Sequence, residues 1–233
     1  MANGRLKAVI FDVDGTLVDS NHLHVEAWQE AFRKYGKELE ARDIHKQIGK
    51  GGDQLMPEFC SEEELDRYGE ELEEFRGELF LDDYLDRVRP FPRVRELFER
   101  VKADGLRIAL ASSAKEDEVE THKKNLNIAE LVDFATSADD VAKSKPSPDI
   151  FQAALDGLQD VAPNEAVIIG DSPWDAVAAK KAGIQMIGLL SGGFSEEELR
   201  NAGVAEIYRD VADLLERYDT SLLGRREAMN ARG

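Results

Sequence analysis

The sequence contains a single cysteine, Cys60, among its 233 residues, so no intrachain disulfide can form. A chain without disulfides fits a reducing compartment, and we expect a cytoplasmic protein. The sequence also lacks any uninterrupted apolar run near the roughly 20 residues that a membrane helix requires. The apolar stretch at residues 6–11 is short and leads directly into acidic residues, which is typical of a core strand and not of a signal peptide. We therefore expect no membrane partner.

Basic residues are scarce, because 30 lysines and arginines face 48 aspartates and glutamates, which leaves a formal net charge of −18. This deficit argues against nucleic acid as a partner, since phosphate backbones are held by clustered Lys and Arg. A small anion can still bind an acidic protein through a local positive pocket or a metal ion. Hydrophobic residues make up 42% of the chain, which is enough for a core.

Short apolar runs occur at residues 6–11, 107–111, 166–170 and 185–190, and a marginal one at 207–208. Each has the composition of a strand buried on both faces. Helical patterns lie between them, at residues 92–104, 115–126, 148–158, 174–182 and 196–201. This alternation predicts an α/β protein in which helices cover both faces of a parallel sheet.

The alternation is interrupted between residues 19 and 88, where no strand-like run occurs. Apolar residues there recur at helical spacing, and residues 62–86 include 12 acidic and 2 basic residues. We interpret this charged run as the solvated face of a long helix. Residues 89–92 then return as a stiff, proline-containing connection. The sequence therefore predicts a core formed by residues 1–18 and 89–233, with an all-α insertion at residues 19–88.

Four polar residues follow or lie near the ends of predicted strands: Asp12, Ser112, Lys145 and Asp171. The carboxyl ends of parallel strands share one edge of a sheet, so these side chains can converge despite their distance in sequence. Asp12 is followed by Asp14 at a spacing of two, and two close carboxylates repel one another unless a cation lies between them. A hard divalent cation such as Mg²⁺ prefers oxygen ligands of this kind.

The other candidates are ordinary when each is taken alone. A serine such as Ser112 before a helix is usually a cap, and a lysine such as Lys145 is usually exposed. Asp175, four residues after Asp171, can face the same side of the helix turn or act as an ordinary acid at a helix N-terminus.

The ordered set of motifs resembles the haloacid dehalogenase superfamily. It consists of DVDGT with a following Asp-Ser, a serine after an apolar strand, Lys-Pro, and GDSPWD. The resemblance extends from Leu6 to about Asp213 and is closest to the phosphoglycolate phosphatase and β-phosphoglucomutase-like branch. It implies a Rossmann-like core with a small mobile helical cap, which corresponds to the insertion at residues 19–88.

The resemblance also implies a role for each carboxylate. Asp12 would be the nucleophile that attacks phosphorus to give an aspartyl-phosphate. Asp14 would first protonate the leaving oxygen and then activate water. Asp12, the backbone carbonyl of Asp14 and Asp171 would hold Mg²⁺.

The remaining roles concern the phosphoryl group and its surroundings. Ser112, Lys145 and Thr16 would bind the phosphoryl group, and Lys145 would also balance the charge of Asp12. Asp175 would support the site by holding Lys145 or a metal-bound water. These roles describe a phosphatase that acts on a small phosphate ester.

Two alternatives lie within the same resemblance, and a third lies outside catalysis. Asp14 argues against dehalogenation, because dehalogenases lack an acid at this position. His24 and neighbouring stretches also resemble sugar phosphomutases, but those carry a Glu where this chain has Gly170 and lack the acid at Asp175. They also use a cap arginine where this chain has the glycine-flanked Lys50. A non-catalytic binding domain is the third alternative, and the complete motif set argues against it.

His24 and Lys50 are the predicted cap contacts with the leaving group. Each has an ordinary alternative: His24 also fits a histidine at the edge of the core that bonds to backbone, and Lys50 fits a solvated lysine on a flexible turn.

Overall fold

The computed structural model describes residues 5–225. Its centre is a six-stranded sheet of order β5-β4-β1-β6-β7-β8 in which all neighbouring strands are parallel. The strands are β1 (Ala8–Phe11), β4 (Arg107–Ala111), β5 (Phe134–Thr136), β6 (Ala166–Gly170), β7 (Gln185–Leu189) and β8 (Glu206–Tyr208). The predicted α/β fold with a parallel sheet is thereby confirmed.

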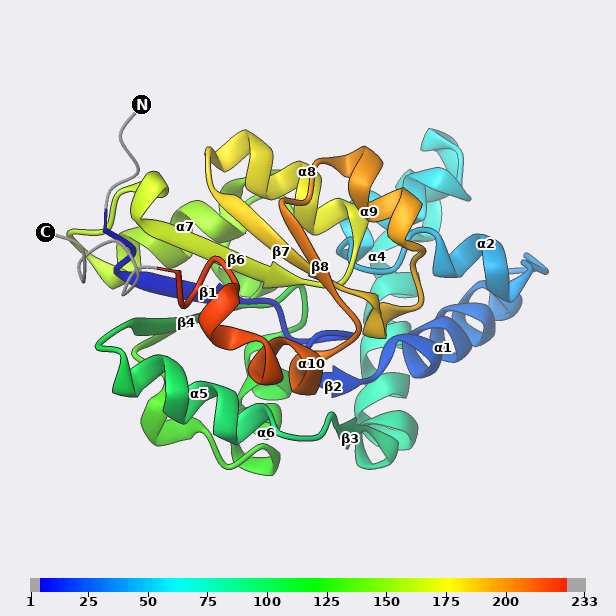
Figure 1. Ribbon diagram of the computed structural model, residues 1–233. Coiled ribbons are helices and arrows are strands. Elements are labelled where there is room, and N and C mark those ends of the chain that lie inside the picture. Colours follow the sequence, from blue (N-terminus) through cyan, green and yellow to red (C-terminus); the bar gives the residue numbers. More distant parts are fainter. Residues whose placement is uncertain (1–4, 226–233) are drawn as a thin grey trace, which may run out of the picture.

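Helices cover both faces of this sheet (Figure 1). Helices α5 (Val94–Ala103), α6 (Glu116–Asn125) and α10 (Val211–Glu216) lie on one face, and α7 (Asp149–Leu158), α8 (Pro173–Ala182) and α9 (Glu196–Ala202) lie on the other. Successive side chains of β1 alternate between the two cores: Val9 and Phe11 pack on the α5 side, Ala8 and Ile10 on the α7 side. Burial on both faces explains why the strands are continuous apolar runs.

Two elements of the core were not predicted. Strand β5 has only three residues, two of them half-buried, and it lies at the edge of the sheet, so it has no apolar run to reveal it. Helix α10 has only six residues, which is too short for a clear period of 3.6.

The chain leaves the sheet after β1 and returns before α5 through a short antiparallel pair, β2 (Val18–Asp19) and β3 (Arg89–Pro90). Between these strands lie α1 (Asn21–Lys34), α2 (Ala41–His45), α3 (Gly52–Leu55) and α4 (Glu62–Leu79), which we call the cap. The cap has a hydrophobic cluster of its own, which includes Trp28, Phe32, Leu55, Tyr68 and Leu72.

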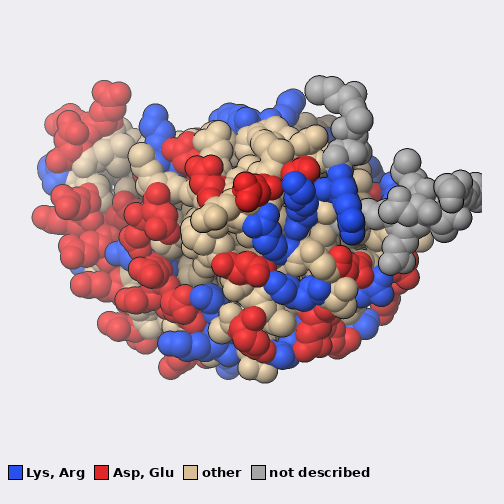
Figure 2. Space-filling model, turned by 90° about the vertical axis from the view of Figure 1, so that its left-hand side faces the viewer, with Lys and Arg blue, Asp and Glu red and all other residues tan. Residues whose placement is uncertain are grey.

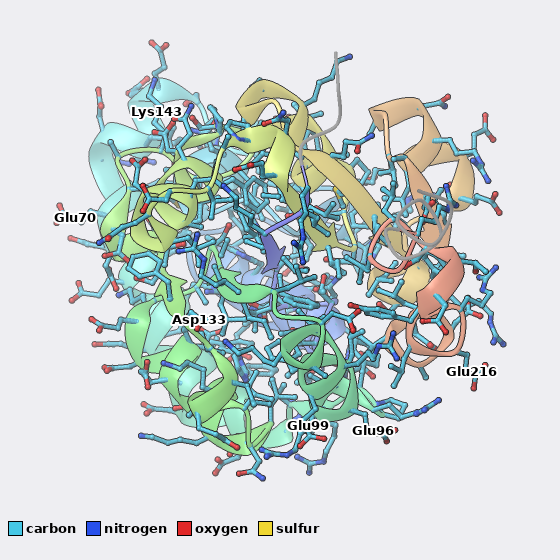
Figure 3. All side chains as sticks on the ribbon, turned by 60° about the vertical axis from the view of Figure 1, so that its left-hand side comes forward. Glu70, Glu96, Glu99, Asp133, Lys143 and Glu216 are labelled. Atoms are coloured by element: carbon cyan, nitrogen blue, oxygen red, sulfur yellow. The ribbon has the colours of Figure 1, made fainter. Side chains whose placement is uncertain are left out.

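The acidic residues of α4 lie largely on its outer surface, where Glu63, Glu70 and Glu74 are exposed. Figure 2 shows acidic side chains crowded at one end of the face that it presents. In Figure 3 the labelled Glu70, and Glu96 and Glu99 of α5, extend away from the ribbon. Within residues 5–225 no helix is both long and apolar enough to cross a membrane.

Candidate active site

The register of the sheet brings the motif residues together. Phe11 of β1 pairs with Leu110 of β4 on one side and with Ile169 of β6 on the other. Asp12, the next residue of the chain, therefore lies at the same sheet edge as Ser112 and Asp171. The Asp12 N–H donates to the Ile169 carbonyl at 2.9 Å, which continues the ladder to the end of the strand.

Asp12 is held on both of its carboxylate oxygens. Lys145 Nζ forms an ion pair with Asp12 Oδ1 and lies 2.8 Å from Asp175 Oδ1. Thr16 Oγ1 lies 3.0 Å from Asp12 Oδ2 and 3.2 Å from Asp171 Oδ1, so the two carboxylates share its one proton. Lys145 is only 1% exposed, which sets it apart from a surface lysine. Asp175 thus contacts Lys145, one of the two contacts that the sequence left open.

Three buried carboxylates form a cluster with the donor set of a hard cation. Asp12, Asp171 and Asp175 each place one oxygen within 4.8 Å of the other two. Burial raises the pKa of Asp12 to about 7; Lys145 opposes this rise, and the charge of Asp175 adds to it. Burial, followed by the charge of Asp12, raises the pKa of Asp171 well above its usual value. Carboxylates that resist ionising together are stabilised by a divalent cation, so these residues fit a metal site.

The side chain of Asp14 takes a different direction. Its Oδ1 accepts a hydrogen bond from Ser20 Oγ at 2.6 Å and lies 2.9 Å from His24 Nε2. Arg76 of α4 contacts His24 Nδ1, and a guanidinium can only donate, so the His24 ring accepts at Nδ1 and donates at Nε2. Burial by itself raises the pKa of Asp14, but the hydrogen bonds from His24 and Ser20 hold that pKa below its usual range.

The serine after β4 is fully buried. Ser112 Oγ accepts a hydrogen bond from the Ala114 N–H at 3.0 Å, so its oxygen helps to stabilise the turn before α6. Its neighbour Ser113 reaches the cap instead, with Oγ 3.4 Å from the Gly49 carbonyl.

A cavity of about 300 Å³ lies between the cap and the sheet edge. The core supplies its floor and one wall, and the cap supplies the facing wall. The lining residues include Asp12, Asp14, Ser113 and Glu118 from the core, and His24, Lys50, Glu73 and Arg76 from the cap. A leaving group attached to a phosphoryl group at Asp12 would occupy this cavity.

Several polar residues of this site were not predicted. Asn21 Nδ2 donates to Asp171 Oδ2 at 2.9 Å. Glu118 and His122 of α6 are 4% and 1% exposed, and His122 Nε2 lies 4.0 Å from Asp14 Oδ1. Arg76 carried a usable signal, because it is one of only two basic residues in the acidic run at residues 62–86. The sequence offered no such signal for Glu118 and His122, because a spacing of four residues is common on any helix.

Comparison with known proteins assigns the family. The family model described as haloacid dehalogenase-like hydrolase matches residues 9–189. The phosphorylated carbohydrates phosphatase of Thermotoga maritima is 31% identical over 187 residues, which cover 78% of this chain and 84% of that relative. The chain belongs to the haloacid dehalogenase-like hydrolases.

Other relatives of this hydrolase agree with that assignment. The validoxylamine A 7′-phosphate phosphatase of Streptomyces hygroscopicus subsp. limoneus is 28% identical over 79% of this chain and 86% of that relative. The crystal structure of a hydrolase from Pseudomonas syringae is 31% identical and matches with a TM-score of 0.84 over 92% of this chain and 98% of that chain. The predicted superfamily and its phosphatase branch are confirmed, and the protein is an enzyme of the phosphoric monoester hydrolase class.

In this haloacid dehalogenase-like hydrolase, Lys50 joins the cap to the core. Its Nζ lies 2.8 Å from Glu58 Oε1 and 4.0 Å from the ring centroid of Trp174 on α8. Trp174 Nε1 in turn donates to the Lys46 carbonyl of the cap at 3.0 Å. The Lys50 side chain is 4% exposed, so it lines the cavity as a docked residue and is not solvated.

This docking predicts the behaviour of Lys50→Ala. The Lys50 ammonium is already paired with Glu58 and stacked on Trp174. We therefore expect its removal to weaken cap closure and not the binding of a charged group on the substrate. The kcat/KM should fall roughly 3- to 10-fold, the equivalent of about 1 kcal/mol, and equally for a charged metabolite ester and an uncharged aryl phosphate. Lys46→Ala, whose side chain is 61% exposed, is the matched control and should leave both values unchanged. A loss confined to the charged ester would instead make Lys50 a direct contact of the substrate.

A second prediction concerns Gly192, which follows β7. A Cβ added there would overlap the Asp171 carboxylate, and the Gly192 carbonyl accepts a hydrogen bond from Asn21 at 3.1 Å. We expect Gly192→Ala to displace Asp171 and to raise the metal concentration required for half-maximal activity about tenfold. Gly69→Ala on α4, where the nearest atom to a Cβ lies at 3.5 Å, is the control. Metal titrations of activity check this, and an unchanged midpoint would show that Asp171 is not displaced.

Proposed function

We propose that this protein is a Mg²⁺-dependent phosphatase that hydrolyses a small phosphorylated metabolite through an aspartyl-phosphate on Asp12. The observation that carries the proposal is the arrangement of Asp12, which has Lys145 and Thr16 on its two oxygens and Asp171 beside it. Within this proposal, residues 1–18 and 89–233 form the catalytic core, and residues 19–88 form a cap that opens and closes about the β2–β3 pair.

The first half of the reaction transfers the phosphoryl group to Asp12. A carboxylate oxygen of Asp12 bonds to phosphorus as the ester P–O bond breaks, and Asp14 gives a proton to the departing oxygen. His24 and Ser20 lower the pKa of Asp14 in the free site, but the negative phosphoryl group of a bound substrate would raise it again. Lys145 and Ser112 offset the charge on the phosphoryl oxygens.

The second half regenerates the enzyme. Asp14, now a carboxylate, takes a proton from water as the water oxygen bonds to phosphorus. The bond from Asp12 to phosphorus breaks, and inorganic phosphate leaves. The carboxylates of Asp12 and Asp171 and the backbone carbonyl of Asp14 would hold Mg²⁺, which supplies positive charge opposite the phosphoryl oxygens when bound.

The environment of Gly170 favours a phosphatase over a sugar phosphomutase. A Cβ at Gly170 would lie 2.9 Å from Asp175 Cγ, so Asp175 fills the space that a larger side chain at this position would need. The phosphomutases that the chain resembles carry Glu there and lack Asp175. The similarity to a phosphatase of phosphorylated carbohydrates also supports a hydroxylated phosphate ester as substrate.

The direct test measures phosphate release from an aryl phosphate and from a panel of sugar and polyol monophosphates. The same panel is assayed for isomerised sugar phosphate in the presence of the corresponding bisphosphate. The proposal expects phosphate release with no isomer formation. Isomerisation faster than phosphate release would replace it with the mutase alternative.

A further inference from the structure

Glu118 is a buried acid that the proposed reaction does not use. It lies in the first turn of α6, is 4% exposed and lines the cavity between cap and core. Its Oε1 atom is shielded from solvent and has no hydrogen-bond partner among residues 5–225. A buried acceptor left in this state costs free energy that a ligand donor can recover.

Two histidines lie close to Glu118 without bonding to its Oε1 atom. His24 Nε2 and His122 Nε2 each lie 3.8 Å from Glu118 Oε1, which is beyond hydrogen-bond distance. Glu118 therefore lines the cavity next to Asp14 with an oxygen that no described residue satisfies.

A complementary donor lines the same cavity from the cap. Arg76 Nε is also shielded from solvent and has no partner in the described part of the chain, although the far end of the same guanidinium contacts His24. One wall thus offers a carboxylate acceptor and the other a guanidinium donor.

A hydroxyl suits both walls, because it can donate to a carboxylate such as Glu118 and can accept from a guanidinium such as Arg76. A carboxylate or second phosphate can only accept and would face the charge of Glu118. An ammonium can only donate and would face the charge of Arg76.

We infer that Glu118 is a specificity-determining residue that accepts a hydrogen bond from a hydroxyl of the leaving group and disfavours a second anion there. This inference rests on the proposed phosphatase activity. It assigns the enzyme to phosphate monoesters of hydroxylated carbon chains that carry no other anionic group near the ester.

The test compares small esters that carry different polar groups on the leaving group. Propyl phosphate and glycerol 3-phosphate share a three-carbon chain, with and without hydroxyls, while phosphoglycolate and 2-aminoethyl phosphate present an anion and a cation. Each ester is measured for turnover and as a competitive inhibitor of aryl phosphate hydrolysis, so a slow substrate still reports its binding. The readout is the ratio of kcat/KM, or of inhibition constants, for glycerol 3-phosphate and propyl phosphate within one variant. A loss of activity that affects both esters equally leaves this ratio unchanged.

We expect the wild-type enzyme to prefer glycerol 3-phosphate by about 10- to 100-fold, the range for a hydrogen bond to a charged group. Glu118→Leu should bring this preference near unity, and Glu118→Gln, which keeps one carbonyl acceptor, should give an intermediate value. Both variants should raise the kcat/KM or the binding of phosphoglycolate relative to that of glycerol 3-phosphate. Glu116→Gln is the matched control, because Glu116 is exposed on the same helix and should leave the preference unchanged. Thermal unfolding verifies that each variant is folded.

The inference would be overturned if the preference for glycerol 3-phosphate over propyl phosphate were equal in the wild-type enzyme and in both Glu118 variants. It would also be overturned if the wild-type enzyme did not distinguish these two esters, or if it favoured phosphoglycolate or 2-aminoethyl phosphate. If the wild-type enzyme hydrolyses neither the aryl phosphate nor any alkyl ester, the proposed function itself fails. That failure is distinct from a phosphatase whose preference ignores Glu118.

Discussion

Asp12→Asn is expected to abolish phosphate release, with kcat lowered by at least about 10⁴-fold, the scale on which loss of a catalytic nucleophile acts. An amide cannot displace the ester oxygen from phosphorus, but it has nearly the size of the carboxylate and keeps an oxygen that can accept from Thr16. The backbone N–H of residue 12 still donates to the Ile169 carbonyl. Phosphate release from an aryl ester measures the loss. Asp156→Asn, on the exposed side of α7, is the matched control and should retain full activity.

The intermediate itself gives a second readout of the same prediction. Asp14→Asn removes the group that activates water but leaves Asp12 able to attack an ester with a good leaving group. Incubation of this variant with an aryl phosphate should therefore accumulate a phosphorylated peptide that contains Asp12, detectable by mass spectrometry after acid quench. Activity retained in Asp12→Asn, or phosphate found on another residue, would remove Asp12 as the nucleophile.

Removal of divalent cations is expected to lower the rate by about 10³-fold, since the metal supplies several kcal/mol of charge stabilisation in the transition state. Mg²⁺ should restore the rate, and Ca²⁺ should inhibit, because its larger coordination number can engage both oxygens of Asp12 and so block attack. Activity after chelation, followed by titration with each ion, measures both effects.

Metal binding can be followed without turnover. A ligand that binds only the folded protein raises its unfolding temperature, so Mg²⁺ should raise the unfolding temperature of the wild-type protein, and more so as its concentration increases. Asp171→Asn should abolish this shift, whereas Asp156→Asn should keep it. Full turnover in excess chelator, with no thermal shift on addition of Mg²⁺, would exclude a metal from the reaction.

The architecture of the core could be predicted from local patterns. Strands β1, β4, β6 and β7 are largely buried on both faces, and each is therefore a mainly apolar run. Polar residues, Asp12, Ser112 and Asp171, directly follow three of them. Because all parallel strands end at one edge, the convergence of Asp12 and Asp171 followed from the strands alone. Strand β5 escaped prediction because an edge strand of three residues needs no such run.

The part of the candidate site at the sheet edge could be predicted from the sequence, and the part formed by side chains of α4 and α6 could not. Asp12, Asp14 and Asp171 belong to short motifs whose backbone is set by the turn after a strand, so their spacing carries information. Arg76 and Glu118 come from the middle of one helix and the first turn of another, in separate parts of the chain.

The tertiary structure alone decided which helix faces meet over the cavity. A helix places about a third of its residues on any given side, and the side that faces a partner is set by packing against distant segments. This is why Lys50 is docked on Trp174, which the local sequence does not indicate, and why Glu118 faces the cavity beside Asp14. The sequence by itself determined the sheet, the helical insertion and the carboxylates of the predicted site. The packing of the cap on the core decided which groups line the cavity above them.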